Sequence, residues 1–154
     1  METIGPEVGD PSSAGLPPAG QRRRLALTGV RGAVAKGRDF TRGALRDWGW
    51  DGTATTEDTL LLASELLTNA SLHAGGCHEL VLTAGETLLI EVYDGTTTLP
   101  SRHPAPQRGI PGGHGLHIVD RLSDCWGSRA HEHGKAVWAE IDASRLKSGR
   151  PTGR

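Results

Sequence analysis

The stretch that decides the fold is TATTEDTLLLASELLTNASLHA, residues 53–74. Its leucines recur at helical spacing, and the threonines at its start can cap a helix, so the stretch predicts one long helix. On a helical wheel, Glu65, Asn69 and His73 share one face about 80° wide. A leucine-rich helix therefore carries a stripe of three polar side chains.

Two interpretations of this polar stripe are open from the periodicity alone. Leu61 and Leu72 border the stripe on one side, and a sector rich in leucine and alanine adjoins it on the other, so we expect it to point into the protein or a cleft. A boundary helix whose three polar groups are satisfied by backbone partners would give the same pattern. The remaining sector, which is predicted to face solvent, holds Ser64, Thr68 and Ser71.

Outward from this helix, the chain alternates between strand-like and helical patterns. The apolar runs 78–83 and 87–93 surround the turn sequence Ala84-Gly85-Glu86 and predict a β-hairpin. Further elements are predicted as a strand at 25–27, helices at 30–48 and 115–122, and a last hairpin formed by 125–130 and 136–141. The predicted fold class is α+β, with a mixed, mostly antiparallel sheet and helices packed on one face.

The chain of 154 residues is predicted to form one domain over residues 22–143. Residues 1–21 and 144–154 are rich in Pro, Gly, Ser and Arg without a period, and we expect both to be disordered tails. The run Arg22-Arg23-Arg24 is interpreted as a solvated junction. Residues 95–112 hold four prolines and three glycines, which indicates a long loop that is either a functional lid or disordered.

Composition and charge limit the classes of function. Lys plus Arg number 17 and Asp plus Glu 18, so no global field favours nucleic acid or an anionic membrane. The longest apolar run, residues 60–63, is too short to span a bilayer, and the first twenty residues do not form a signal peptide. We expect a soluble cytoplasmic protein whose two cysteines, Cys77 and Cys125, are unpaired.

Three clusters carry residues suited to chemistry: the polar stripe, the strand end Glu91-Val92-Tyr93-Asp94-Gly95, and the glycine run at residues 112–115 that opens into a helix. Backbone amides at such a helix start bind phosphate well. Turn formation alone would also explain the glycine run and Asp94. The sequence contains no Walker loop and no complete Rossmann fingerprint, so a different kind of nucleotide site is needed.

In order along the chain, these motifs resemble the signatures of a known family. They are ELLTNA (65–70), VYD (92–94), GHGLHIV (113–119), CWG (125–127) and GKAVWAE (134–140). Together they are similar to the GHKL (histidine kinase/Hsp90-like) ATP-binding domain, and most similar to stand-alone anti-sigma-factor serine/threonine kinases of actinobacterial type. The resemblance covers roughly residues 25–141. It implies a Bergerat-type two-layer α/β sandwich that binds ATP and Mg²⁺.

The resemblance also implies roles for single residues of the stripe and the strand end. Asn69 would give its side-chain oxygen to Mg²⁺, whose octahedron is completed by phosphates and water. Glu65, one turn earlier, would be the general base, and His73 would either lie towards the phosphates or fill the wall. Asp94 would accept a hydrogen bond from the adenine amino group, which disfavours guanine because its carbonyl oxygen would face the carboxylate.

The loop at 95–112 corresponds to the family's ATP lid, and the helix that follows it to a phosphate-binding segment. The cofactor-binding positions implied here are Thr96, Gly113, His114, Gly115 and Leu116. The superfamily has a glycine where this chain has Thr96. It also has a threonine close to Lys135-Ala136, whose hydroxyl supports a water molecule at the adenine.

For function, the resemblance implies a serine/threonine protein kinase that phosphorylates a small STAS-type anti-anti-sigma partner and thereby regulates a sigma factor. The alternative is a nucleotide-gated binding protein with little or no phosphotransfer. Relatives suggest a homodimer. Direct nucleic-acid binding and membrane association are not expected.

Overall fold

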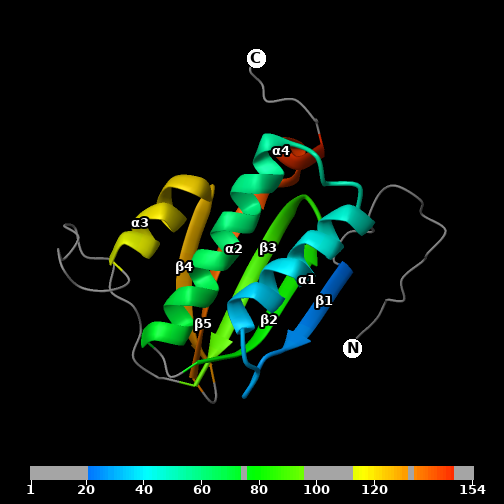
Figure 1. Ribbon diagram of the computed structural model, residues 1–154. Helices are drawn as coiled ribbons and strands as arrows, with labels where there is room; N and C mark the ends of the chain where they lie inside the picture. The colour runs from blue at the N-terminus through cyan, green and yellow to red at the C-terminus, as the bar shows by residue number, and fades with distance from the viewer. Residues whose placement is uncertain (1–20, 74–75, 96–112, 132–133, 148–154) are drawn as a thin grey trace.

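The computed structural model describes residues 21–73, 76–95, 113–131 and 134–147 (Figure 1). The elements follow in the order β1 (Gln21–Ala26), α1 (Ala33–Asp47), α2 (Ala54–His73), β2 (Cys77–Ala84), β3 (Thr87–Asp94), α3 (Gly113–Leu122), β4 (Cys125–His131), β5 (Gly134–Asp142) and α4 (Ala143–Lys147). The predicted long helix and both predicted hairpins are confirmed.

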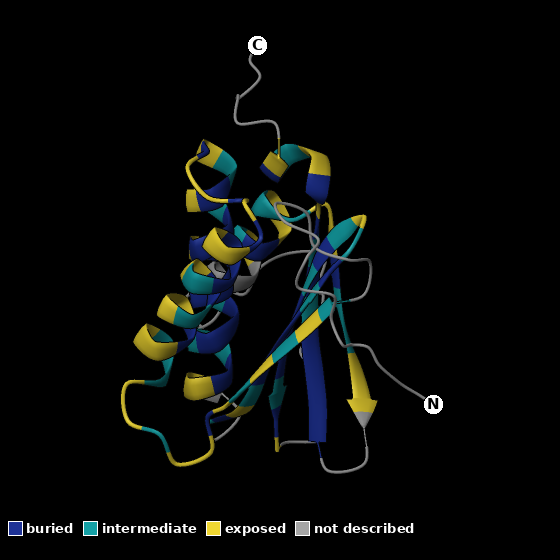
Figure 2. Cartoon of the chain, turned by 90° about the vertical axis from the view of Figure 1, so that its right-hand side faces the viewer, coloured by how far each residue is buried: buried dark blue, intermediate teal, exposed yellow. Residues whose placement is uncertain are grey.

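The strands form one five-stranded sheet in the order β1-β2-β3-β5-β4. Figure 2 shows two layers, with the helices on one face of this sheet. The fold class is therefore α+β, as predicted. All four pairings are antiparallel, so the prediction of a mixed sheet is wrong for the described strands. The physical reason is that the hairpin of β4 and β5 places β5, not β4, beside β3.

Strand periodicity sorts the side chains of the central strand β3 between the two faces of the sheet. Leu88, Ile90 and Val92 are buried and belong to the hydrophobic core. Across the core, α2 supplies Leu62, Leu66 and Leu67, which are also buried. The core thus lies between the sheet and the helical layer, with α2 as the central helix.

Helix α2 begins with the predicted threonine cap. The Thr56 amide donates to Thr53 Oγ1 at 2.9 Å, and the Thr53 amide donates to Thr56 Oγ1 at 3.3 Å, so each threonine satisfies an amide of the other. After the helix, Gly76 has φ 113°, and its amide donates to the carbonyl of Ala70 at 3.1 Å. Glycine adopts this left-handed conformation without strain, so the chain can turn away from the helix at this point.

The predicted solvent sector of α2 is partly wrong. Ser64 is buried and donates to the Leu60 carbonyl, whereas Leu61 and Leu72 are exposed at 44% and 62%. Helices α1 and α3 pack on the two sides of α2, so only a narrow outer strip of α2 meets solvent. That strip is centred on Leu61 and Leu72 rather than on Ser64.

Helices α1 and α2 approach closely at Gly37. A Cβ atom at Gly37 would lie 2.4 Å from Leu67 Cδ1. Only glycine leaves room for the leucine, which explains why α1 contains a residue of low helix propensity in its interior.

The first strand is longer than predicted and includes the three arginines. Arg22 and Arg24 are exposed, whereas Arg23 pairs with Asp47 at 2.7 Å and lies 5.1 Å from the ring centroid of Trp48. The interpretation of this run as solvated thus holds for Arg22 and Arg24 and is wrong for Arg23, because alternate residues of β1 turn towards the helical layer.

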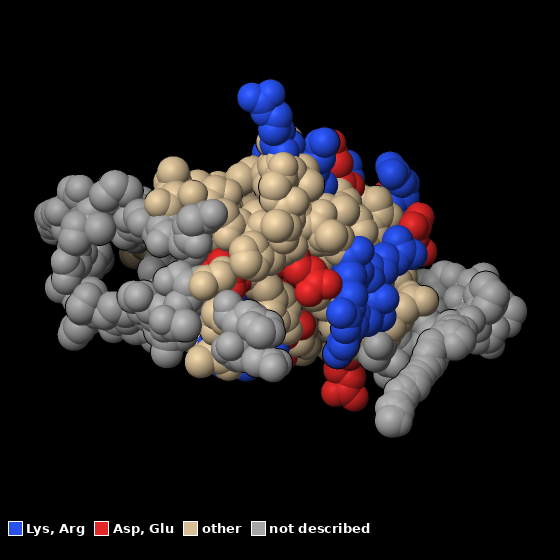
Figure 3. Space-filling view, turned by 90° about the horizontal axis from the view of Figure 1, so that it is seen from below, with Lys and Arg blue, Asp and Glu red and all other residues tan. Residues whose placement is uncertain are grey.

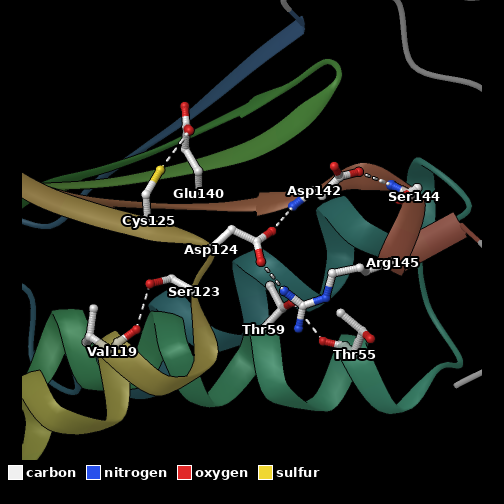
Figure 4. Close-up of polar contacts among 10 residues, drawn as sticks. All are labelled: Thr55, Thr59, Val119, Ser123, Asp124, Cys125, Glu140, Asp142, Ser144 and Arg145. Carbon is white, nitrogen blue, oxygen red and sulfur yellow. Dashed lines mark hydrogen bonds and ion pairs between the residues drawn. The ribbon is translucent and has the colours of Figure 1, made fainter. Parts of the chain in front are cut away.

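A short helix, α4, follows β5 where a disordered tail was predicted. Ala143 and Leu146 of α4 are buried. Asp124 joins this helix to the sheet: its Oδ2 accepts from the Asp142 amide at 2.6 Å, and its Oδ1 accepts from Arg145 at 2.6 Å (Figure 4). The ordered chain thus continues at least to Lys147. No helix in the described part of the chain is long and apolar enough to cross a membrane.

Candidate functional site

Four segments that are distant in sequence end or begin at the same end of the molecule, at the bottom of Figure 1. They are the C-terminal end of α2, the starts of β2 and β5, and the end of β3. Strand register brings Asp94 opposite both Cys77 and Lys135. The strand-end carboxylate thus lies at the same end as the last turns of the helix that carries the polar stripe, whereas α3 begins at the left of the view.

A buried ion pair occupies this end of the sheet. Lys135 Nζ lies 2.9 Å from Asp94 Oδ2, and the two side chains are only 7% and 1% exposed. Strand alternation places both on the helix-facing side of the sheet, in line with the core residues Val92 and Val137. Charged groups are rarely buried so deeply unless they are paired, because desolvation opposes it.

Glycines fix the backbone around Asp94. A Cβ atom at Gly134 would lie 1.9 Å from the Asp94 carbonyl oxygen, and one at Gly95 would lie 2.8 Å from the His78 ring. The start of β5 is therefore pressed directly against the end of β3. This contact holds Lys135, the residue after Gly134, beside the carboxylate.

The polar stripe of α2 contributes Asn69 and Glu65, which are both half-buried. Asn69 Nδ2 is buried, and it has no hydrogen-bond partner among the described residues. A buried polar atom without a partner costs about 1–3 kcal/mol and calls for an explanation. The unpaired atom is a donor, so it would suit an acceptor such as a phosphate oxygen, whereas a metal ion would take the amide oxygen.

Cys77 lies beside Asp94 and forms part of the wall at this end. Burial raises the pKa of the Cys77 thiol, and the negative charge of Asp94 acts in the same direction, whereas a hydrogen bond with Ser71 opposes them. Cys77 is thus a neutral, buried thiol, and Cys125 is an exposed free thiol. Both cysteines are unpaired, as predicted.

Glu91 and Tyr93, from the same sequence cluster as Asp94, face the opposite side of the sheet. There Glu91 pairs with Arg129, and Tyr93 donates to Glu91 Oε2 at 3.3 Å. Burial, and then the charge of Glu91, raise the pKa of Tyr93, whereas the hydrogen bond to Glu91 raises the pKa of Arg129. The strand period thus separates this cluster from the candidate site.

Several predicted site residues lie outside the described residues. All of the predicted lid except Gly95 belongs to this group, Thr96 included, as do the side chains of His73, His114 and Leu116. Of the glycine run, Gly113 and Gly115 lie in the first turn of α3, which packs against α2. Helix α3 thus packs beside the helix that carries Asn69.

Figure 3 looks onto this end of the molecule. Lys and Arg side chains gather on the side of β1, whereas acidic side chains lie nearer the centre. Among the described residues, no group of three or more His, Cys, Asp and Glu side chains is arranged to hold a metal ion. A metal at this site would therefore depend on Asn69 together with oxygens from a ligand and from water, a mode that suits Mg²⁺.

Lys135 and Gly134 are the site residues that sequence reasoning missed. One signal was present: Lys135 falls at the same strand phase as Val137, Ala139 and Ile141, so alternation places its charge on the buried face.

No protein-family model matches this sequence, and no curated protein matches it significantly.

Proposed function

We propose that this chain is an ATP- and Mg²⁺-binding serine/threonine protein kinase of the anti-sigma-factor type, built on a Bergerat-type sandwich of the GHKL superfamily. The observation that carries the proposal is the coincidence, at one end of the core, of the buried Asp94 carboxylate and the unsatisfied Asn69 amide. The resemblance assigns these two residues, in that order, to the adenine and to the metal. The α+β architecture with helices on one face of the sheet is consistent with this assignment.

The chemistry of each side chain fits its proposed part. Asp94 is acceptor-only when ionised, which suits the adenine amino group, and its burial excludes competing water. Asn69 offers an amide oxygen, a ligand type that Mg²⁺ accepts. Mg²⁺ neutralises charge on the phosphates when bound, and the start of α3 adds backbone amides that point at an anion.

Glu65 lies one helical turn before Asn69 and is half-buried. In the proposed reaction, Glu65 takes the proton of a partner serine hydroxyl. The serine oxygen forms a bond to the γ-phosphorus, and the bond from that phosphorus to the bridging β-phosphate oxygen breaks, which leaves ADP and a phosphoserine. The chain thus needs only to position the groups and to hold one proton.

The proposed partner is a small STAS-type anti-anti-sigma protein, whose phosphorylation decides whether this chain holds a sigma factor. We place the protein in the cytoplasm and propose that it works as a homodimer.

A binding measurement tests the nucleotide site. Mg·ATP at about 100 times its dissociation constant should stabilise the fold by roughly 2.7 kcal/mol, which corresponds to several degrees in the melting temperature of a domain this size. The shift should shrink when Mg²⁺ is removed by EDTA. A melting temperature that does not change on addition of millimolar Mg·ATP would refute the proposal.

Phosphotransfer is tested separately with radiolabelled γ-phosphate and partners captured in the presence and absence of Mg·ATP. Glu65→Gln should abolish labelling of the partner and leave the Mg·ATP shift nearly unchanged. Glu57→Gln, on an exposed position two turns earlier in α2, is the matched control and should label normally. If wild-type protein labels no partner but ATP still changes complex formation, the chain is a nucleotide-gated binding protein and not a kinase.

A further inference from the structure

Among the described residues of the candidate site, Lys135 is the one buried cation, and the proposed function gives it no part. Its ammonium lies 2.9 Å from Asp94 Oδ2, and its side chain is 7% exposed. Lysine has a long, flexible stem and normally carries its charge to water. Asp94 is proposed to bind the nucleotide base. A buried lysine beside it is therefore expected to affect which base the site prefers.

The order of the two charged groups is fixed by the sheet. Asp94 and Lys135 are register partners on adjacent strands, and the Gly134 backbone is packed against the Asp94 carbonyl. Since both side chains are buried as well, neither has room to exchange places with the other. The site thus presents one acceptor-only group and one donor-only group side by side in a constant order.

We infer that Lys135 is a specificity-determining residue that donates a hydrogen bond to adenine N1, the ring nitrogen next to the amino group, while Asp94 accepts from that amino group. The inference rests on the proposed function. The Watson–Crick edge of adenine offers one donor and one acceptor on neighbouring atoms, which is the complement of this pair. A carboxylate has about four lone-pair positions, so Asp94 accepts from the lysine and from the base together.

The same order rejects guanine twice. The guanine carbonyl oxygen would face the Asp94 carboxylate, and the guanine N1–H would face the Lys135 ammonium. Each mismatch leaves a buried polar group unpaired. If Asp94 alone recognised the base, only the first of these mismatches would occur. Lys135 is therefore expected to increase the ratio of ATP affinity to GTP affinity.

The test changes the ligand first, because that leaves the protein intact. The probe is 1-deaza-ATP, in which a C–H group replaces N1, titrated into the wild-type chain with Mg²⁺ by calorimetry. A hydrogen bond from a charged donor contributes enough that its loss should weaken binding about 10- to 100-fold relative to ATP. Equal affinities for the two nucleotides would overturn the inference.

The second arm changes the lysine. In Lys135→Met, ATP and 1-deaza-ATP should bind alike, and the ratio of ATP to GTP affinity should fall relative to wild type. Lys36→Met, on the exposed side of α1, is the matched control and should keep both differences. Lys135→Gln retains a neutral donor and should restore part of the difference between ATP and 1-deaza-ATP, which a purely structural role for Lys135 would not produce.

The outcomes separate this inference from the proposed function. If wild-type protein binds no Mg·ATP at all, the proposed function fails and the inference fails with it. If Mg·ATP binds but the loss of N1 makes no difference in wild type, or if Lys135→Met still distinguishes the two nucleotides, only the part given to Lys135 is wrong.

Discussion

The two ends of the sheet differ in where their charged side chains lie. At the end that carries α4, the charged side chains are partly exposed and have partners: Asp124 accepts from Asp142 and Arg145, and Asp142 accepts from Ser144. At the other end, two charged side chains are buried together, and Asn69 Nδ2 is buried without a hydrogen-bond partner among the described residues. Trp50 Nε1 and Thr83 Oγ1 are also buried without such a partner, so the contrast rests on the charged groups.

This difference separates a structural end from a binding end. Hydrogen bonds near solvent can be replaced by water, so the α4 end tolerates change at little cost. Buried charges oppose folding, and proteins keep such features mainly where function needs them. Substitutions at the two ends should therefore differ in both the size and the sign of their effect on stability.

The largest effect is expected from breaking the Asp94–Lys135 pair. Lys135→Met leaves a buried carboxylate without its counter-ion, and Asp94→Asn leaves a buried ammonium, so each single change should lower the free energy of unfolding by about 3–5 kcal/mol. Urea denaturation of the two variants measures these losses.

The double variant Asp94→Asn/Lys135→Met supplies the control for this pair. With both charges removed, most of the lost stability should return, because neither side chain leaves an unpaired charge. Losses that simply add in the double variant would show that the two groups are solvated independently and that the pair does not define this end.

A somewhat smaller effect is expected for Gly134→Ala. The new Cβ atom would lie 1.9 Å from the Asp94 carbonyl oxygen, so the two strands must move apart, at a cost of about 1–3 kcal/mol. The same movement displaces Asp94 and should reduce the Mg·ATP melting shift.

Gly127→Ala is the matched comparison for that change. Its Cβ atom would meet the Trp138 side chain at 2.9 Å, and a side chain yields more easily than a backbone. Gly127 lies on β4, away from the candidate site, so this variant should keep the full Mg·ATP shift. A normal shift in Gly134→Ala would mean that the β3–β5 contact does not position the site.

Asn69→Ala should have the opposite sign. It removes a buried amide nitrogen that lacks a partner among the described residues and introduces a better helix former, so the free energy of unfolding should rise by about 1 kcal/mol while the Mg·ATP shift disappears. Thr68→Ala, at the neighbouring half-buried position, gains helix propensity without touching the stripe, and should keep the shift. A less stable Asn69→Ala variant would indicate that the amide contributes to the fold.

Much of this architecture could be predicted from local sequence signals. The threonine cap of α2, the Ala84-Gly85-Glu86 turn and the alternation in β3 are local features, and the structure contains all three elements. The sheet order was not predictable in this way, because the insertion of β5 beside β3 depends on pairing between residues about fifty positions apart.

The candidate site shows the same limit. Asn69 and Asp94 carry recognisable motifs, but the partner of Asp94 comes from another strand, and only the register identifies Lys135. The exposed strip of α2 was misplaced for a related reason: the wheel gives relative angles, whereas the packing of α1 and α3 decides which angle meets solvent. Local pattern thus predicts the elements, and tertiary packing decides their neighbours.

The smallest effect is expected at the structural end and depends on pH. The pKa of Asp142 is lowered first by a hydrogen bond from the Ser144 side chain and then by one from the Ser144 amide, which donates to Asp142 Oδ1 at 2.8 Å at the start of α4. The stabilisation is fully present above the ordinary pKa of the carboxyl group and is lost as pH falls through the lowered value. Asp142→Asn keeps an acceptor at the helix start, so its melting temperature should match wild type at pH 7 and fall less steeply than wild type between about pH 5 and pH 3. The Mg·ATP melting shift at pH 7 should be identical in the two proteins. If their melting temperatures fall in parallel with pH, the negative charge of Asp142 contributes nothing to stability beyond its hydrogen bond.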